Sequence, residues 1–305
     1  MKKPRQFSIG IIAILLCVLL GNCQSMATAT SIGAQIAGAT GLIDQNTADA
    51  ISLSATAIAS ATEEITPEQE HFIGRAVAAN ILGNYRIWNG NPRLTSYLNL
   101  ICQAIVINSP RPEIYGNYRV AILDSDEINA FATSGGHIFI TRGLIASARS
   151  EDALAGVIAH EIAHIQLQHS IRAIRTSRIT QAIMVTGASA AGVAGGYDVN
   201  ELTDIFNETI GDIVSTLVNN GYSQSQEFEA DTVAMGLLAS AGYNPSGLID
   251  MLRELERTQS ARPGGFNRTH PTPAQRITNA ERALGRHQVS DTSASRQARF
   301  ASTAR

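Results

Sequence analysis

The spacing of apolar and polar positions along the chain predicts many helices and a small sheet. Thr66 and Pro67 are preferred as the N-cap and first residue of a helix, so a helix is expected over about 66–87. Two apolar runs rich in β-branched residues, 118–123 and 137–141, predict strands. The predicted fold class is therefore α+β, mainly helical with a small sheet. Further helices are expected at about 93–107, 151–175, 199–219, 223–241, 245–259 and 272–284.

The first residues have the pattern of a secretory signal. Basic residues precede an apolar run from Ile9 to Leu20, which is too short to span a bilayer comfortably. The sequence from Leu20 to Cys23 resembles a lipobox, in which the chain is cut before a cysteine that receives lipid. We therefore expect a signal peptide over 1–22 and an acylated Cys23. Plain secretion and an uncleaved anchor are the alternatives, and all three place the body of the protein outside the cytoplasm.

Composition divides the remainder into three parts. Residues 23–62 are rich in small residues and predict a low-complexity tether, 63–287 a folded domain, and 288–305 an Arg/Ser-rich, frayed tail. The formal net charge of −3 argues against a nucleic-acid partner. The basic tail is either solvated or in contact with anionic lipid. Removal of the signal and acylation of Cys23 would leave Cys102 without a disulfide partner, and its apolar neighbours predict burial.

Residues 160–164, HEIAH, carry the clearest chemistry. On a helix, the spacing of His160 and His164 puts both imidazoles on one face, where they can share a Zn²⁺ ion. Glu161 is turned about 100° away and can take a proton from a metal-activated water. The alternative is a pair of ordinary helical histidines. On a helix that continues to about residue 175, His169 lies roughly opposite His160, so it is not expected to be a ligand.

A third metal ligand is expected in the sequence EFEAD at 227–231. Glu227 and Asp231 share a helical face, whereas Glu229 should point elsewhere. We therefore predict Glu227 as the ligand and Asp231 as the carboxylate that orients an imidazole. The alternative is that both acids face solvent on an acidic stretch of the chain.

These motifs carry a family resemblance. The chain resembles the zinc metallopeptidase family of the CAAX prenyl proteases and HtpX, peptidase family M48, and is most similar to its soluble branch that faces the cell envelope. The resemblance covers roughly residues 65–285. It rests on HEIAH, on EFEAD, on NAF at 129–131 followed by GGHIFI at 135–140, and on THP at 269–271 with RI at 276–277.

The resemblance implies a gluzincin-type peptidase with one Zn²⁺ per chain. His160, His164 and Glu227 would hold the zinc, and Glu161 would be the base. His270 would lie at the rim of the active site, where it either stabilises an oxyanion or fills the open zinc position in a resting state. A purely structural role of His270 is the remaining alternative.

The resemblance also implies that an extended substrate pairs with an edge strand beside the zinc. The strand that follows Gly136, with His137 and Ile138, is predicted to be that edge; the alternative is a plain core strand. Asn129 is expected either to hydrogen-bond the substrate or to cap a turn. The small, apolar segment 182–196 is interpreted as a flap between the zinc-bearing helices or as a segment on a membrane surface.

Two functions follow from this reading. The first is a zinc-dependent endopeptidase that hydrolyses misfolded or unassembled envelope proteins and is tied to a membrane by its lipid. The second is a zinc-binding, chaperone-like or scaffold protein without turnover. The presence of Glu161 favours the first, because a protein without turnover has no need of that base.

Overall fold

The structure is a computed structural model of the chain. By contact it divides into two compact units, one of residues 1–64 with 173–205 and one of residues 65–172 with 206–305. No helix among the described residues is both long and apolar enough to cross a bilayer. The structure describes residues 23–45, 48–49, 52, 65–172, 210–211, 213–259, 270–285, 287 and 294–304.

The first unit contributes one long described helix, α2 (Cys23–Ala39). It forms within the segment expected to be a tether. The predicted signal peptide, residues 1–22, lies outside the described residues, and so does the apolar segment 182–196.

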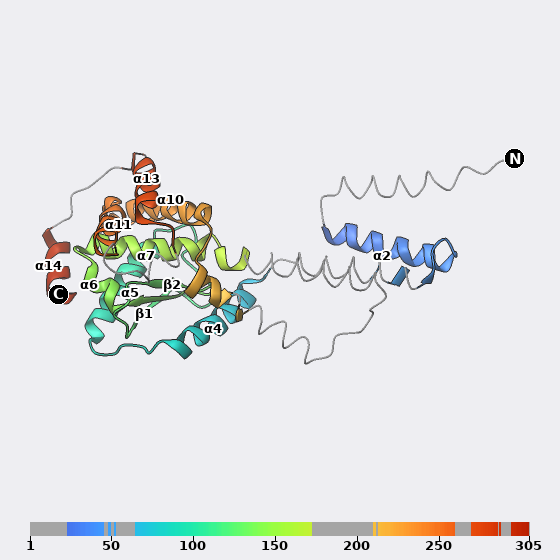
Figure 1. Ribbon diagram of the computed structural model, residues 1–305, viewed down its shortest axis with the longest axis horizontal. Coiled ribbons are helices and arrows are strands. Elements are labelled where there is room, and N and C mark those ends of the chain that lie inside the picture. The colour runs from blue at the N-terminus through green and yellow to red at the C-terminus, as the bar shows by residue number, and fades with distance from the viewer. Residues whose placement is uncertain are drawn as a thin grey trace. The chain divides into compact units, whose positions relative to one another are not determined.

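The second unit is an α+β fold, which confirms the predicted class: many helices accompany a three-stranded sheet. Two helices precede the sheet and the others follow it in the chain (Figure 1). The strands are β1 (Arg119–Leu123), β2 (Ala130–Ala132) and β3 (His137–Thr141). The helices are α4 (Pro67–Asn84), α5 (Pro92–Val106), α6 (Arg142–Ser147), α7 (Glu151–Gln166), the π-helix η1 (Thr216–Asn220), α10 (Gln224–Ser240), α11 (Ser246–Gln259), α13 (Pro273–Leu284) and α14 (Ala294–Thr303).

Polar residues fix the starts of the helices that matter most for the site. Ser150 caps α7, because its side chain accepts a hydrogen bond from the backbone N–H of Ala153. Ser223 and Gln226 form a reciprocal capping box at the start of α10. These caps set where each helix begins and therefore which residues of its sequence face the interior.

The sheet has the strand order β1-β3-β2. β3 pairs in parallel with β1, with His137 opposite Arg119, and antiparallel with β2, with Ile140 opposite Ala130. The expectation that the strand after Gly136 is an edge strand is therefore wrong. β3 is the central strand, because it pairs with β1 on one side and with β2 on the other. The edge strands are therefore β1 and the short β2.

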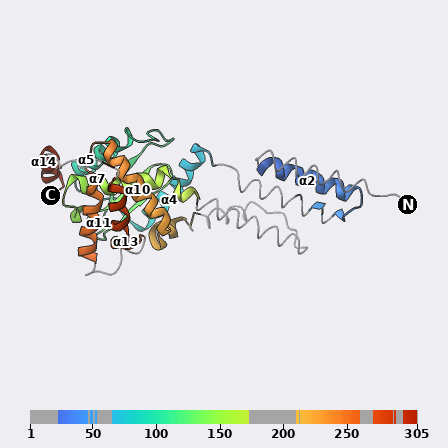
Figure 2. The same ribbon diagram turned by 90° about the horizontal axis from the view of Figure 1, so that it is seen from above.

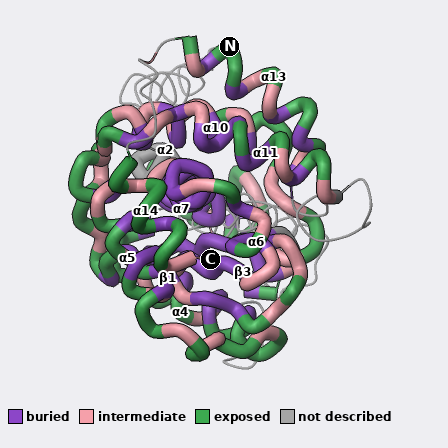
Figure 3. The backbone as a smooth tube through the Cα atoms, turned by 90° about the vertical axis from the view of Figure 1, so that its left-hand side faces the viewer, coloured by how far each residue is buried: buried purple, intermediate pink, exposed green. Residues whose placement is uncertain are grey.

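Helix α7 lies at the centre of the second unit. In Figure 1 it runs between the sheet and the layer formed by α10, α11 and α13, and Figure 2 shows these three helices from above. All residues from Glu151 to Ile165 are buried, as the continuous purple of α7 in Figure 3 shows. A Cβ on Gly156 would come within 2.7 Å of the Leu248 Cα atom, so α11 packs directly on the α7 backbone. Residues 160–164 are therefore held in a rigid, closely packed helix.

The C-terminal segment differs from the expected frayed tail, because residues 294–303 form α14. Phe300 is buried in the core, and Arg299 makes two hydrogen bonds to the Glu151 carboxylate at the start of α7, at 3.1 and 2.6 Å. Arg296 forms an ion pair with Asp152 at 3.3 Å. The acids that open α7 are buried, and these arginines supply part of the charge that compensates them. A composition-based expectation of fraying took no account of these distant partners.

Candidate metal centre

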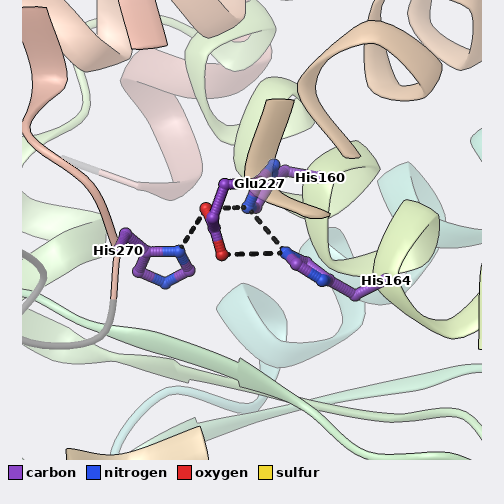
Figure 4. A group of neighbouring side chains, drawn as sticks. All are labelled: His160, His164, Glu227 and His270. Carbon is purple, nitrogen blue, oxygen red and sulfur yellow. Dashed lines mark hydrogen bonds and ion pairs between the residues drawn. The ribbon is translucent and has the colours of Figure 1, made fainter. Parts of the chain in front are cut away.

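Four side chains from three segments converge beside α7. His160 and His164 project from α7, Glu227 from the first turn of α10, and His270 from the residues before α13 (Figure 4). One nitrogen or oxygen from each lies within 4.8 Å of the others. The His160 and His164 Nε2 atoms are 3.0 Å apart, and each is 3.4 Å from a Glu227 oxygen. The spacings read from the sequence thus bring the three predicted ligands together.

The buried ion pair of Asp231 and Arg276 orients His160. Its Nδ1 lies 3.0 Å from Asp231 Oδ1, one turn along α10 from Glu227. Arg276 binds Asp231 with two donors, Nε at 3.0 Å and Nη2 at 2.7 Å, and its Nη2 lies 3.2 Å from His160 Nδ1. Asp231 therefore lies where a carboxylate can orient an imidazole, as its spacing predicted. The sequence identified Arg276 only as part of the RI motif at 276–277 and predicted no role for it.

His169 lies beside His164 rather than opposite His160. The prediction assumed that the helix continues to about residue 175, and this was wrong. Helix α7 ends at Gln166, and Gln168 adopts a positive φ of 55° that turns the chain. The Nδ1 atoms of His164 and His169 are 2.8 Å apart. Glu229, which was expected to point away from the metal, reaches His169 Nε2 at 3.2 Å.

The sequence patterns did not predict that Tyr222 contacts the metal cluster. Its ring stacks on His164 with centroids 4.4 Å apart and planes 17° apart. Burial raises the pKa of the Tyr222 hydroxyl above its ordinary value, which keeps it neutral. A lone tyrosine directly before a helix cap gave no sequence signal for this contact.

Glu161 is the acidic residue of HEIAH, and only 2% of its surface is exposed to solvent. Its Oε1 atom is buried and has no hydrogen-bond partner among the described residues. Burial raises the pKa of Glu161 to about 7, against the opposing effect of His160. A buried carboxylate oxygen that has no hydrogen-bond partner in the described part of the chain, and that is electrostatically coupled to His160 and Glu227, is suited to hold a water or a substrate group.

The electrostatics of the cluster keep its carboxylates charged. Burial and Arg276 lower the pKa of His160, but the hydrogen-bonded carboxylates of Asp231 and Glu227 outweigh both and raise it to about 9. Burial raises the pKa of Glu227, and the surrounding histidines pull it well below its usual range. The site therefore keeps carboxylate charge in the interior, and Arg276 compensates part of it, with Nη2 2.7 Å from Asp231 Oδ1 and Nη1 3.6 Å from Glu227 Oε2.

The two remaining histidines of the cluster are poised in the neutral form. Burial lowers the pKa of His164 to about 3, and burial also lowers that of His270. Neutral imidazoles and a carboxylate are the ligands that Zn²⁺ takes in proteins. The donor set, the buried carboxylates and the unpaired Glu161 oxygen thus all fit a zinc ion.

The predicted substrate-binding residues are placed differently from the metal cluster. Ile138 is fully buried in the core, and His137 lies 3.4 Å from Thr133 Oγ1, with burial lowering its pKa to about 4. Gly136 has a φ of 92° and marks the turn into β3. Asn129 accepts a hydrogen bond from the Ala130 N–H at 2.9 Å, a local contact of the capping kind, directly before edge strand β2.

Arg276→Met is expected to lower the free energy of unfolding by about 3–5 kcal/mol, because it leaves the buried Asp231 carboxylate without its strongest partner. Urea unfolding in the presence of zinc measures this. The matched control is Arg253→Met, which breaks the exposed pair with Glu281 and should cost less than about 1 kcal/mol. Similar losses in both variants would contradict the role given to Arg276.

A helix carrying two histidines one turn apart, with a glutamate between them and a third candidate ligand from a later helix, defines the metal centre of a gluzincin-type metallopeptidase. The comparison with known families agrees with this class. The chain belongs to Peptidase family M48, whose family model matches residues 92–284. The family recognised from the sequence motifs is thereby confirmed.

Three relatives illustrate this membership. Metalloprotease LoiP of Escherichia coli is 31% identical over 160 residues, 52% of this chain and 59% of LoiP. A putative beta-barrel assembly-enhancing protease of Vibrio cholerae is 29% identical over 232 residues, 72% of this chain and 45% of that protein. An HtpX homologue of Salinibacter ruber is 29% identical over 197 residues, 56% of this chain and 69% of that protein. The chain spans about half the length of the first two.

Proposed function

We propose that this protein is a zinc-dependent endopeptidase, with the zinc held by His160, His164 and Glu227. The observation that carries the proposal is the convergence of these three side chains. Next to His160 in the chain, Glu161 has a buried oxygen without a hydrogen-bond partner among the described residues. Zinc bound there would polarise a peptide carbonyl and acidify a water molecule. Family membership supports the same reaction class.

Glu161 would act as the general base. Its Oε1 atom would accept a proton from the attacking water and later deliver it to the nitrogen of the leaving amine. Burial raises the pKa of this carboxyl above its ordinary value, which makes it a stronger proton acceptor than a solvated glutamate. Tight packing of α7 would hold this carboxylate in position through the reaction.

Strand β2 would receive the substrate. Among the described residues its only ladder partner is β3, and it packs against α7, the helix that carries His160 and His164. An extended peptide would add to this edge through main-chain hydrogen bonds, so the preference for particular side chains would be weak. Asn129 directly precedes β2, but its backbone N–H and C=O are both hydrogen-bonded to Thr141, so the peptide would pair with β2 itself.

Digestion of casein with and without a zinc chelator tests the proposal. Hydrolysis that is lost with the chelator and regained on adding zinc is the expected result. Zinc bound at the site without any hydrolysis would instead support the second function, a chaperone-like or scaffold protein that binds zinc and has no turnover.

His270 would act at the open side of the zinc position. Its Nδ1 atom lies 2.7 Å from Glu227 Oε2, and its ring belongs to the four-residue cluster, which supports the blocking role over that of an oxyanion donor. His270→Ala is therefore expected to raise basal casein hydrolysis or self-cleavage. A loss of turnover by about a hundredfold would instead identify an oxyanion donor. Unchanged kinetics, zinc content and self-cleavage would eliminate both roles.

The substrates would be misfolded or unassembled proteins of the cell envelope. A relative is named for enhancing the assembly of beta-barrel proteins, and barrels of that kind belong to outer membranes. A comparison of envelope proteins in cells with the wild type and with the Glu161→Gln variant would identify them as the species that accumulate in the variant.

A lipid on Cys23 would hold the enzyme at a membrane. The lipobox-like sequence that ends at this residue is the support for this step. Cys23→Ser is expected to abolish incorporation of labelled fatty acid and to release a soluble form, since acyl chains supply the anchoring free energy. Labelling that misses Cys23 in the wild type would contradict the anchor and leave a secreted or signal-anchored enzyme.

A further inference from the structure

We propose that His169, held in turn by Glu229, is a positioning residue that fixes the tautomer in which His164 presents a lone pair to the metal centre. The inference rests on the proposed function, because it takes His164 Nε2 as the ligand atom. It deepens that function by adding a side-chain relay that the spacing of the motifs did not predict.

The relay runs from the metal centre toward the protein surface. His164 directs Nε2 at His160 and Glu227 and has Nδ1 2.8 Å from His169 Nδ1. His169 is fully buried, and its Nε2 atom lies 3.2 Å from Glu229 Oε2. The Glu229 side chain is 44% exposed and is also paired with Arg172 at 3.2 Å. Both nitrogens of each imidazole are therefore committed to a neighbour.

The direction of each hydrogen bond follows from the carboxylate. Glu229 can only accept, so His169 Nε2 carries the proton and donates it. A neutral imidazole has a single N–H, which leaves His169 Nδ1 as an acceptor and requires His164 Nδ1 to donate to it. His164 Nε2 then has no proton, and its lone pair faces the centre. The other tautomer of His164 would place two lone pairs against each other at 2.8 Å.

Separate groups hold the plane of the ring and its proton. Tyr222 stacks on His164 and fixes the plane of the imidazole, whereas His169 fixes which nitrogen carries hydrogen. The positive φ of Gln168 makes this possible, because it turns His169 back toward α7. His160, by contrast, is oriented directly by Asp231. The two histidines on α7 are thus prepared for the metal by different neighbours.

Zinc affinity of the full-length protein, measured by competition with a chromophoric chelator, tests the relay. His169→Leu is expected to weaken zinc binding by about 10–100-fold, the range seen for groups that orient a metal ligand. His169→Asn should recover much of this affinity, because its side-chain carbonyl can accept the His164 N–H. A role confined to packing would instead favour leucine over the smaller, polar asparagine.

Glu229→Ala provides a second test in case the His169 variants fold poorly. It should weaken zinc binding less than His169→Leu does, since it removes only the outer partner. The matched control is Glu281→Ala, because Glu281 is also a half-exposed acid paired with an arginine but has no histidine contact in the described structure. Equal zinc affinity in the Glu229 and Glu281 variants would overturn the proposal.

Nitrogen chemical shifts of His164 in the metal-free protein separate this inference from the proposed function. The wild type is expected to show a single tautomer with the proton on Nδ1, and His169→Leu a mixture of both. A mixture in the wild type would refute the relay whatever the zinc affinity. A wild type with the expected tautomer but without zinc binding would support the relay and refute the proposed zinc enzyme.

Discussion

Replacement of Glu161 by glutamine is expected to remove peptidase turnover while leaving zinc bound. The substitution keeps the size of a buried side chain on α7 but removes the oxygen that would accept the proton of the attacking water. General base catalysis contributes about 10²–10⁴-fold, so casein hydrolysis should fall by at least that factor. Metal content of the purified variant should match the wild type, because all three proposed ligands remain.

The control for this experiment is Glu281→Gln, an identical change at a half-exposed position on α13. Its hydrolysis and zinc content should both stay at the wild-type level. Turnover near the wild-type value in zinc-loaded Glu161→Gln protein would contradict the assignment of the base. Loss of zinc together with activity would show that Glu161 acts on the metal site itself.

Replacement of Glu227 by alanine is expected to remove most of the bound zinc. The side chain is fully buried and supplies the only carboxylate of the four-residue cluster, with both oxygens directed at histidines. Without Glu227, only the two histidines of α7 remain of the three proposed ligands, and a catalytic zinc site ordinarily needs three protein ligands. Zinc content of the purified protein by elemental analysis measures the effect.

Two further variants on α10 allow the zinc content of the Glu227 variant to be compared with smaller expected losses. Glu229→Ala should lose far less zinc, because Glu229 contacts His169 rather than the centre. Asp231→Asn should be intermediate, because asparagine keeps one acceptor near His160 but weakens the pair with Arg276. Equal zinc loss in the Glu227 and Glu229 variants, or loss confined to the second, would overturn the choice of ligand.

The sequence predicted features that depend on local spacing. The helix start at Thr66 follows from its capping residue, and the helix expected over about 223–241 is α10; the structure has both. The i, i+4 spacings in HEIAH and EFEAD put His160 with His164, and Glu227 with Asp231, on shared faces of α7 and α10. Such features are set within a few turns of one helix, so they can be predicted without knowledge of the rest of the fold.

Predictions about neighbours across the chain were less successful. β3 was taken as an edge, but β2, a strand of three residues, covers one of its sides. Residues 294–303 were expected to fray, but Glu151 and the apolar core supply partners for Arg299 and Phe300. Both errors concern long-range partners, which the composition and periodicity of a single segment do not specify.

The sequence by itself determined the class of chemistry, since two histidines, a glutamate and a later carboxylate have few other uses at these spacings. Only the tertiary structure decided which groups support that chemistry. Arg276 reaches Asp231 from a different helix, and His169 reaches His164 because one residue, Gln168, departs from helical geometry. A single φ angle and the packing of α13 on α10 depend on the free energy of the whole fold, whereas the ligand spacing depends on one helical repeat.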